Sequence, residues 1–123
     1  MGEAYEKMGS AYKKVRKYKE AFDWFWKSLR SFIHESNKLP SFEKLPRIVE
    51  DIREVVVASG QNIIPILEDI EKEFTTHFTI FQPVTGKVYV RLSSYYIEAK
   101  RLKKSYECIK KACEAHLDRR NMQ

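Results

Sequence analysis

Apolar residues recur three and four positions apart along most of the chain, the spacing that gathers them on one face of an α-helix. In residues 2–36 this pattern is interrupted once, at Arg16 and Lys17. The pair Leu39-Pro40 ends it, because a residue that precedes proline is disfavoured in helical geometry. The first third of the chain is therefore predicted to form two helices joined by a short turn.

The helical spacing resumes in the middle of the chain and predicts two further helices. Ser41 is suited to cap the start of the first one, and Gly60 stands where glycine commonly follows a helix end. Asn62 is suited to cap the second helix, with Pro65 in its first turn. Residues 41–80 are thus predicted to form a helical hairpin.

Residues 75–85 are the least helical stretch, since they are rich in Thr, Phe and Ile and contain Pro83. They predict either a short extended connector or an extra turn of helix. After Gly86 the helical spacing returns. The chain holds only four Gly and four Pro, which favours long helices over a turn-rich β fold. We therefore predict an all-α protein of about six helices in antiparallel hairpins.

Composition and cysteine usage narrow the class of protein. The length of 123 residues fits one domain, residues 1–123, and 43% hydrophobic with 33% charged residues is typical of a folded chain. We find no secretory signal and no transmembrane stretch, and expect no membrane association. Cys108 and Cys113 fall on different faces of a predicted helix, so they are not expected to pair. Unpaired thiols favour a cytoplasmic location, with a nuclear one as the alternative.

Charge changes sign along the chain although the net value is +6. Residues 1–33 carry a balance of +4, residues 34–85 one of −4, and residues 86–123 one of +6. This order of basic, acidic and basic segments favours association of the segments with one another and leaves basic surface near each end.

Residues 2–36 and residues 86–119 share a pattern of large, small and aromatic positions. In the first stretch the pattern is formed by Tyr5, Met8, Gly9, Tyr12, Tyr18, Ala21, Phe25 and Ser28. In the second it is formed by Tyr89, Leu92, Ser93, Tyr96, Leu102, Ser105, Ile109 and Ala112. Small residues allow two helices of a hairpin to approach closely, and the aromatic residues fill the space beside them. The pattern resembles the tetratricopeptide repeat.

The resemblance implies helical hairpins stacked as a short α-solenoid that binds proteins in a groove. The middle segment, residues 41–80, lacks the small-residue positions. The two matching stretches lie 84 residues apart, which is not a multiple of the repeat length of about 34. The middle segment is therefore a degenerate or inserted hairpin.

The groove positions implied by the resemblance are Glu6, Ser10, Lys13, Lys14, Val90 and Ser94. One subclass of the family holds a peptide carboxylate with Lys and Asn at two of these positions. Glu6 and Ser10 do not match that pair, so we expect no such carboxylate clamp.

Two basic clusters surround the predicted turns within the two matching hairpins. Their residues are Arg16, Lys17, Lys19, Lys100, Arg101, Lys103 and Lys104. They predict a basic ridge that attracts an acidic protein, phosphates or RNA. The alternative is a set of solvated turns, with lysines at helix ends where the helix dipole favours cations.

Four aromatic residues crowd one predicted helix, and at least one of Trp24 and Trp26 is expected to be exposed unless another helix covers it. An exposed tryptophan would be an anchor for a partner or for self-association. The alternative is packing against the middle hairpin.

Catalytic and metal-binding patterns are missing from the sequence. The three histidines lie far apart, and no ligand spacing, phosphate loop or nucleophile motif occurs. We predict a protein-interaction adaptor or scaffold, with no enzyme activity, metal or cofactor. Nucleic-acid binding through the basic ridge is the first alternative and a self-associating structural subunit the second. Three repeats are few for this family, which implies that the chain belongs to a longer protein or self-associates.

Overall fold

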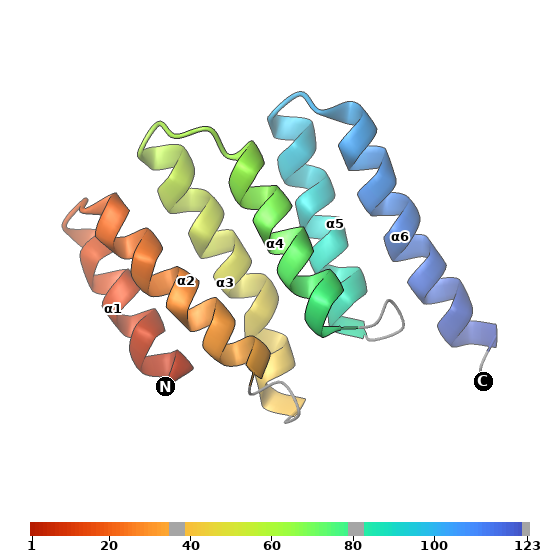
Figure 1. Ribbon diagram of the computed structural model, residues 1–123, viewed down its shortest axis with the longest axis horizontal. Helices are drawn as coiled ribbons and strands as arrows, with labels where there is room; N and C mark the ends of the chain where they lie inside the picture. Colours follow the sequence, from red (N-terminus) through yellow and green to blue (C-terminus); the bar gives the residue numbers. More distant parts are fainter. Residues whose placement is uncertain (35–38, 79–82, 122–123) are drawn as a thin grey trace. The chain divides into compact units, whose positions relative to one another are not determined.

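The computed structural model describes residues 1–34, 39–78 and 83–121, with side chains at 1–34, 44–78 and 84–114. The described residues form six helices and no strand, which confirms the predicted all-α class (Figure 1). The helices are α1 (Gly2–Lys14), α2 (Tyr18–His34), α3 (Leu39–Ala58), α4 (Ile64–His77), α5 (Pro83–Glu98) and α6 (Leu102–Asn121).

The chain divides into two compact units, Met1–Ile63 and Ile64–Gln123. The first unit contains α1, α2 and α3, and the second contains α4, α5 and α6. The middle segment that was predicted as one hairpin is thus shared between the units.

In the first unit, α1 and α2 form an antiparallel hairpin whose contact depends on two glycines (Figure 1). A Cβ atom at Gly9 would lie 2.7 Å from the ring of Phe25, and one at Gly2 would lie 2.7 Å from the ring of Phe32. The Ser28 hydroxyl donates a hydrogen bond of 2.9 Å to the carbonyl oxygen of Gly2. Any larger residue at Gly9 or Gly2 would therefore force the two helices apart.

Helix α3 packs along α2 and runs parallel to α1 (Figure 1). Two ion pairs join α1 to α3, Lys13 with Glu54 and Glu3 with Lys44, and both span 41 positions of sequence. Equal spacing at both ends keeps the two parallel helices in one register. The pair of Lys13 with Glu54 has the polarity expected of a basic first segment and an acidic middle segment, whereas the pair of Glu3 with Lys44 has the reverse polarity.

In the second unit, α5 and α6 form an antiparallel hairpin closed by two small polar residues (Figure 1). The hydroxyls of Ser93 and Ser105 lie 2.8 Å apart and both residues are buried. Helix α4 packs on α5, where Thr75 Oγ1 lies 3.2 Å from the Tyr89 hydroxyl oxygen. The small residues of the repeat pattern therefore lie where the helices approach each other, as predicted.

The same turn ends α1, α3 and α5. Arg16, Gly60 and Lys100 have φ angles of 62°, 77° and 61°. In each case the amide of that residue binds the carbonyl three positions back, and the next amide binds the carbonyl five positions back. This is the Schellman arrangement, in which a left-handed residue satisfies the last carbonyls of a helix. The prediction that Gly60 follows a helix end is confirmed.

One predicted helix boundary differs from the structure. Helix α3 begins at Leu39, so Ser41 lies inside its first turn and does not cap it. Proline is well tolerated at the first positions of a helix, which is why Pro40 did not delay the start. Of residues 75–85, the first three extend α4 and the last three begin α5, while residues 79–82 lie outside the described part of the chain.

Candidate functional site

Two of the groove positions of α1, Glu6 and Lys13, interact with charged residues of α3 in the same unit. Glu6 and Ser10 are half-buried, Lys14 is exposed, and Lys13 binds the Glu54 carboxylate. The hydrogen bond from Lys13 to Glu54 raises the pKa of the lysine. The two parallel helices thus present one continuous surface on which opposite charges are already paired.

Asp51 of α3 lies within this charged surface. Its partial burial raises the pKa of the carboxyl from 3.8 to about 6. The negative charges of Glu54 and Glu6 raise that pKa further, whereas Lys13 lowers it. The surface between α1 and α3 therefore carries charges of both signs, and Asp51 on it becomes protonated at mildly acidic pH.

The groove positions of α5 have a different chemistry. Val90 and Ser94 are exposed, and the Ser94 hydroxyl donates a bond of 3.5 Å to the Val90 carbonyl oxygen. Ile97 lies on the same helical face, seven positions after Val90, and is 54% exposed. An exposed row on the adjacent helix α6 is also mostly apolar and contains Leu102, Tyr106, Ile109 and Cys113. These residues, with Val90 and Ile97, are called the apolar stripe below.

Sequence reasoning placed part of the apolar stripe inside the protein. Leu102 and Ile109 fill packing positions of the repeat pattern, yet they are 71% and 41% exposed. Met8 of the first hairpin is similarly 40% exposed. A packing position is buried only where a neighbouring helix covers it, and the described part of the second unit has no helix after α6. The pattern alone does not contain this information.

The two basic clusters surround equivalent turns but belong to different units. Arg16, Lys17 and Lys19 are exposed beside the α1–α2 turn. At the α5–α6 turn, Lys104 is half-buried and lies 3.4 Å from the Glu71 carboxylate. The remaining residues of that cluster, Lys100, Arg101 and Lys103, are exposed. One continuous basic ridge therefore remains a prediction.

Both tryptophans are half-buried beside another ring. The ring centroids of Trp24 and Tyr5 lie 5.8 Å apart, and Lys27 Nζ lies 4.6 Å from the Trp24 ring. The ring centroids of Trp26 and Phe22 lie 5.9 Å apart. Each tryptophan thus has neighbours within its own unit, and its use as an anchor for a partner remains a prediction.

A polar cluster around Glu71 was missed by sequence reasoning. The Tyr96 hydroxyl donates a bond of 2.7 Å to Glu71 Oε2, and Cys108 Sγ lies 3.7 Å from Glu71 Oε1. Burial, strengthened by the negative charge of Glu71, raises the pKa of the Cys108 thiol to about 12. The thiol is therefore protonated and unreactive at neutral pH. The cluster joins α4 to α5 and α6, and helical spacing does not distinguish Glu71 from the other acidic residues of α4.

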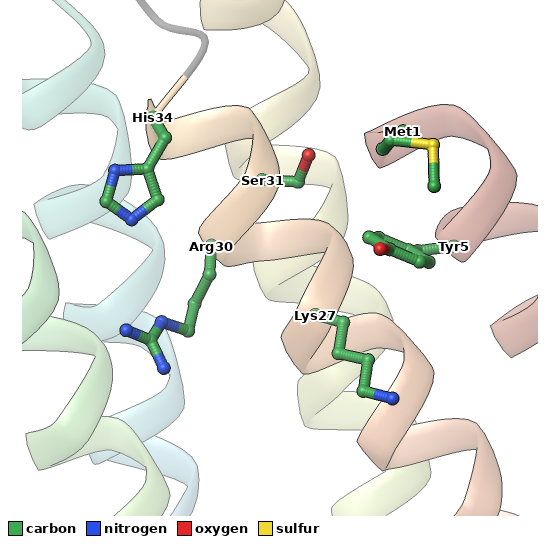
Figure 2. A pocket seen from close by; sticks show the side chains of 6 residues that line it. All are labelled: Met1, Tyr5, Lys27, Arg30, Ser31 and His34. Carbon is green, nitrogen blue, oxygen red and sulfur yellow. The ribbon is translucent and has the colours of Figure 1, made fainter.

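A shallow depression of about 520 Å³ lies between the start of α1 and the second half of α2. Figure 2 shows Tyr5 on one side of it, while Arg30 and His34 extend to the other side of α2. Because the cationic side chains do not converge on one point, the depression does not form a pocket for a small anion.

No family model, no curated protein and no solved structure matches this chain. Among the described side chains, no three potential ligands from His, Cys, Asp and Glu lie close enough to hold a metal ion. None of the described helices is both long and apolar enough to span a bilayer.

Proposed function

We propose that this chain is a tetratricopeptide-like adaptor that binds a partner protein on the faces of α1 and α5. The observation that carries the proposal is the repeated construction of the α1–α2 and α5–α6 hairpins. A small residue on the first helix of each hairpin allows close approach, Gly9 against the Phe25 ring in the first and Ser93 against Ser105 in the second. The same left-handed turn, at Arg16 and at Lys100, closes both.

A second line of support comes from the surface between α1 and α3. Parallel neighbouring helices of successive hairpins form the groove in this kind of repeat. The two ion pairs at equal spacing hold α1 and α3 in that relation. Glu6, Ser10, Lys13 and Lys14 would then contact the partner on the first unit, and Val90 and Ser94 would do so on the second.

Affinity capture from a lysate of the source organism, followed by mass spectrometry, tests this function. We expect one dominant protein that remains bound after nuclease treatment and at high salt. The double variant Glu6→Ala with Lys14→Ala should lose it, because both side chains lie on the proposed contact surface and outside the core. A matched variant, Lys17→Ala with Lys19→Ala, changes exposed residues at the turn and should retain it.

The alternatives predict different results in the same experiment. Capture that disappears with nuclease or modest salt, and is lost in the turn variant, would support nucleic-acid binding through the basic clusters. Capture of nothing except further copies of the chain would support a self-associating subunit. Either result would overturn the adaptor proposal.

A further inference from the structure

The two hairpins correspond residue by residue at a spacing of 84 positions. Arg16 and Lys100 have φ angles of 62° and 61°. In the first turn, backbone amides donate hydrogen bonds to the carbonyl oxygens of Lys13 and Tyr12. In the second turn, the equivalent amides donate to the carbonyl oxygens of Ile97 and Tyr96. Each residue of α6 therefore has a defined counterpart in α2, and each residue of α5 has one in α1.

The face of α2 that corresponds to the apolar stripe is covered in the first unit. Phe25 and Leu29 are fully buried, whereas their counterparts Ile109 and Cys113 are exposed. Tyr18 and Phe22 are half-buried, and their counterparts Leu102 and Tyr106 are 71% and 68% exposed. Successive residues of a helix turn by about 100°, which places Leu29 and Phe22 beyond the side that meets α1, toward α3. The first hairpin thus provides a template for how such a face is filled, namely by one further helix.

The counterparts on the first helix of each hairpin indicate the chemistry of a helix that would cover the apolar stripe. Lys13 binds Glu54 of α3, and its counterpart Ile97 is apolar and 54% exposed. The negative charge of Glu6 raises the pKa of Asp51 on α3, whereas the counterpart of Glu6, Val90, is apolar and 49% exposed. A helix seated on α5 and α6 would therefore meet apolar side chains where α3 meets charged ones, and would need an apolar face of its own.

Positive charge outweighs negative charge around the apolar stripe, which also has the exposed Glu98 and Glu114 beside it. Lys103 and Lys110 border it along α6, seven positions apart, and Lys87 borders it on α5. The α5–α6 turn adds Lys100 and Arg101, all five cations being exposed. Residues 86–123 carry a balance of +6. The flanks of a docked helix should therefore be acidic.

We infer that the apolar stripe binds one amphipathic helix of a partner protein whose flanks are acidic. This inference rests on the proposed adaptor function and specifies the partner for the α5 part of the site. A second copy of the chain is a poorer occupant. The open side of its first hairpin, beside Tyr5 and Trp24, carries the cation Lys27, which would face the cations of the stripe.

Two synthetic peptides about as long as α3, which has 20 residues, test the inference. Both have leucines at helical spacing, and their flanking positions are Glu in one peptide and Lys in the other. Fluorescence anisotropy with the full chain should show binding of the acidic peptide and at least tenfold weaker binding of the basic one. The variant Ile97→Ser with Ile109→Ser should weaken binding of the acidic peptide at least tenfold.

A matched control separates loss of the stripe from loss of the fold. The variant Val15→Ser with Val57→Ser changes valines that are 64% and 53% exposed in the first unit, and should bind as the unchanged chain does. Circular dichroism should show the same helical content and a cooperative melting transition for the stripe variant as for the unchanged chain.

Three outcomes would overturn the inference. The first is that neither peptide binds, and the second is that both bind equally. The third is a concentration-dependent dimer in sedimentation that dissociates in the Ile97→Ser, Ile109→Ser variant, which would make a second copy the occupant. If that variant still captures from lysate the protein that the Glu6→Ala, Lys14→Ala variant loses, the adaptor function holds and the stripe has no part in it.

Discussion

In the first unit a helix that follows the hairpin, α3, packs on α2, whereas in the second unit a helix that precedes the hairpin, α4, packs on α5. The two hairpins are therefore covered on different sides. Tyr96 is fully buried and binds Glu71 of α4, while its counterpart Tyr12, which has no preceding helix among the described residues, is half-buried. Conversely, Leu29 is fully buried and its counterpart Cys113 is exposed.

This difference shows that hairpins with the same sequence pattern can pack against different neighbouring helices. The pattern specifies how the two helices of a hairpin meet, through small residues and a left-handed turn. Burial of the outer faces depends on which neighbour is present. The comparison predicts that equivalent substitutions in the two hairpins have unequal effects.

The largest difference is expected between Phe25→Ala and Ile109→Ala. Phe25 is fully buried against Gly9, so its truncation should destabilise the first unit by about 3–5 kcal/mol. Ile109 is 41% exposed, and its truncation should cost about 1 kcal/mol or less. Urea denaturation followed by circular dichroism measures both. Equal losses would mean that the two faces are covered alike.

Glu71→Ala should destabilise the second unit by about 1–3 kcal/mol, because the buried Tyr96 hydroxyl would lose its acceptor. Glu54→Ala is the matched control in the first unit, since it removes an ion pair whose side chains are 36% and 39% exposed. Such a pair contributes about 1 kcal/mol at most. The two free energies of unfolding should be compared under the same conditions. A control loss as large as that of Glu71→Ala would contradict the account.

The small-residue contact of the second hairpin predicts a non-additive pair of substitutions. Ser105→Ala alone should cost about 1 kcal/mol, since it leaves the buried Ser93 hydroxyl without its partner. The double variant Ser93→Ala with Ser105→Ala should regain most of this loss, because neither hydroxyl remains. A double-mutant cycle from denaturation curves measures the coupling. Additive losses would show that the hydroxyls do not depend on each other.

The stability of the first unit should depend slightly on pH because of Asp51, whereas the apolar stripe has no such titrating group. The Asp51 pKa is about 6 in the folded chain and 3.8 without the fold. Because the folded value is higher, ionisation opposes folding, so stability should fall as pH rises between these two values and then stay constant.

Asp51→Asn should remove that slope and stabilise the chain at neutral pH by about 1 kcal/mol or less, after allowance for solvent screening. Denaturation midpoints across the acidic range measure it. Identical pH profiles for the variant and the unchanged chain would contradict the assignment to Asp51.

Much of the fold follows from the sequence because helical spacing and turn residues are local signals. The spacing predicted all six helices, and Gly60 marked the end of α3. The start of α3 was misplaced because Pro40 is compatible with a first helical turn. Gly9 and Ser93 were assigned correctly to close contacts, since only small residues fit where helices meet.

The candidate site was less predictable because it depends on contacts between distant segments. The exposure of Ile109 and Leu102 reflects the absence of a covering helix in the described second unit, which no local pattern encodes. Glu71 is one of several acidic residues on α4, and only the packing of Tyr96 and Cys108 distinguishes it. The ion pair of Lys13 with Glu54 joins residues 41 positions apart. The alternation of charge along the sequence indicated only that a base of the first segment could pair with an acid of the middle segment.

Site-specific photo-crosslinking can show whether a partner protein covers the apolar stripe. Benzoylphenylalanine placed at Tyr106, in the open stripe, should give one discrete crosslinked protein in a lysate of the source organism, unchanged by nuclease. The same probe at the counterpart Phe22, which stacks on Trp26 in the covered hairpin, should give crosslinks within the chain only. No adduct at Tyr106, or one that disappears with nuclease, would contradict a protein-binding role for this face.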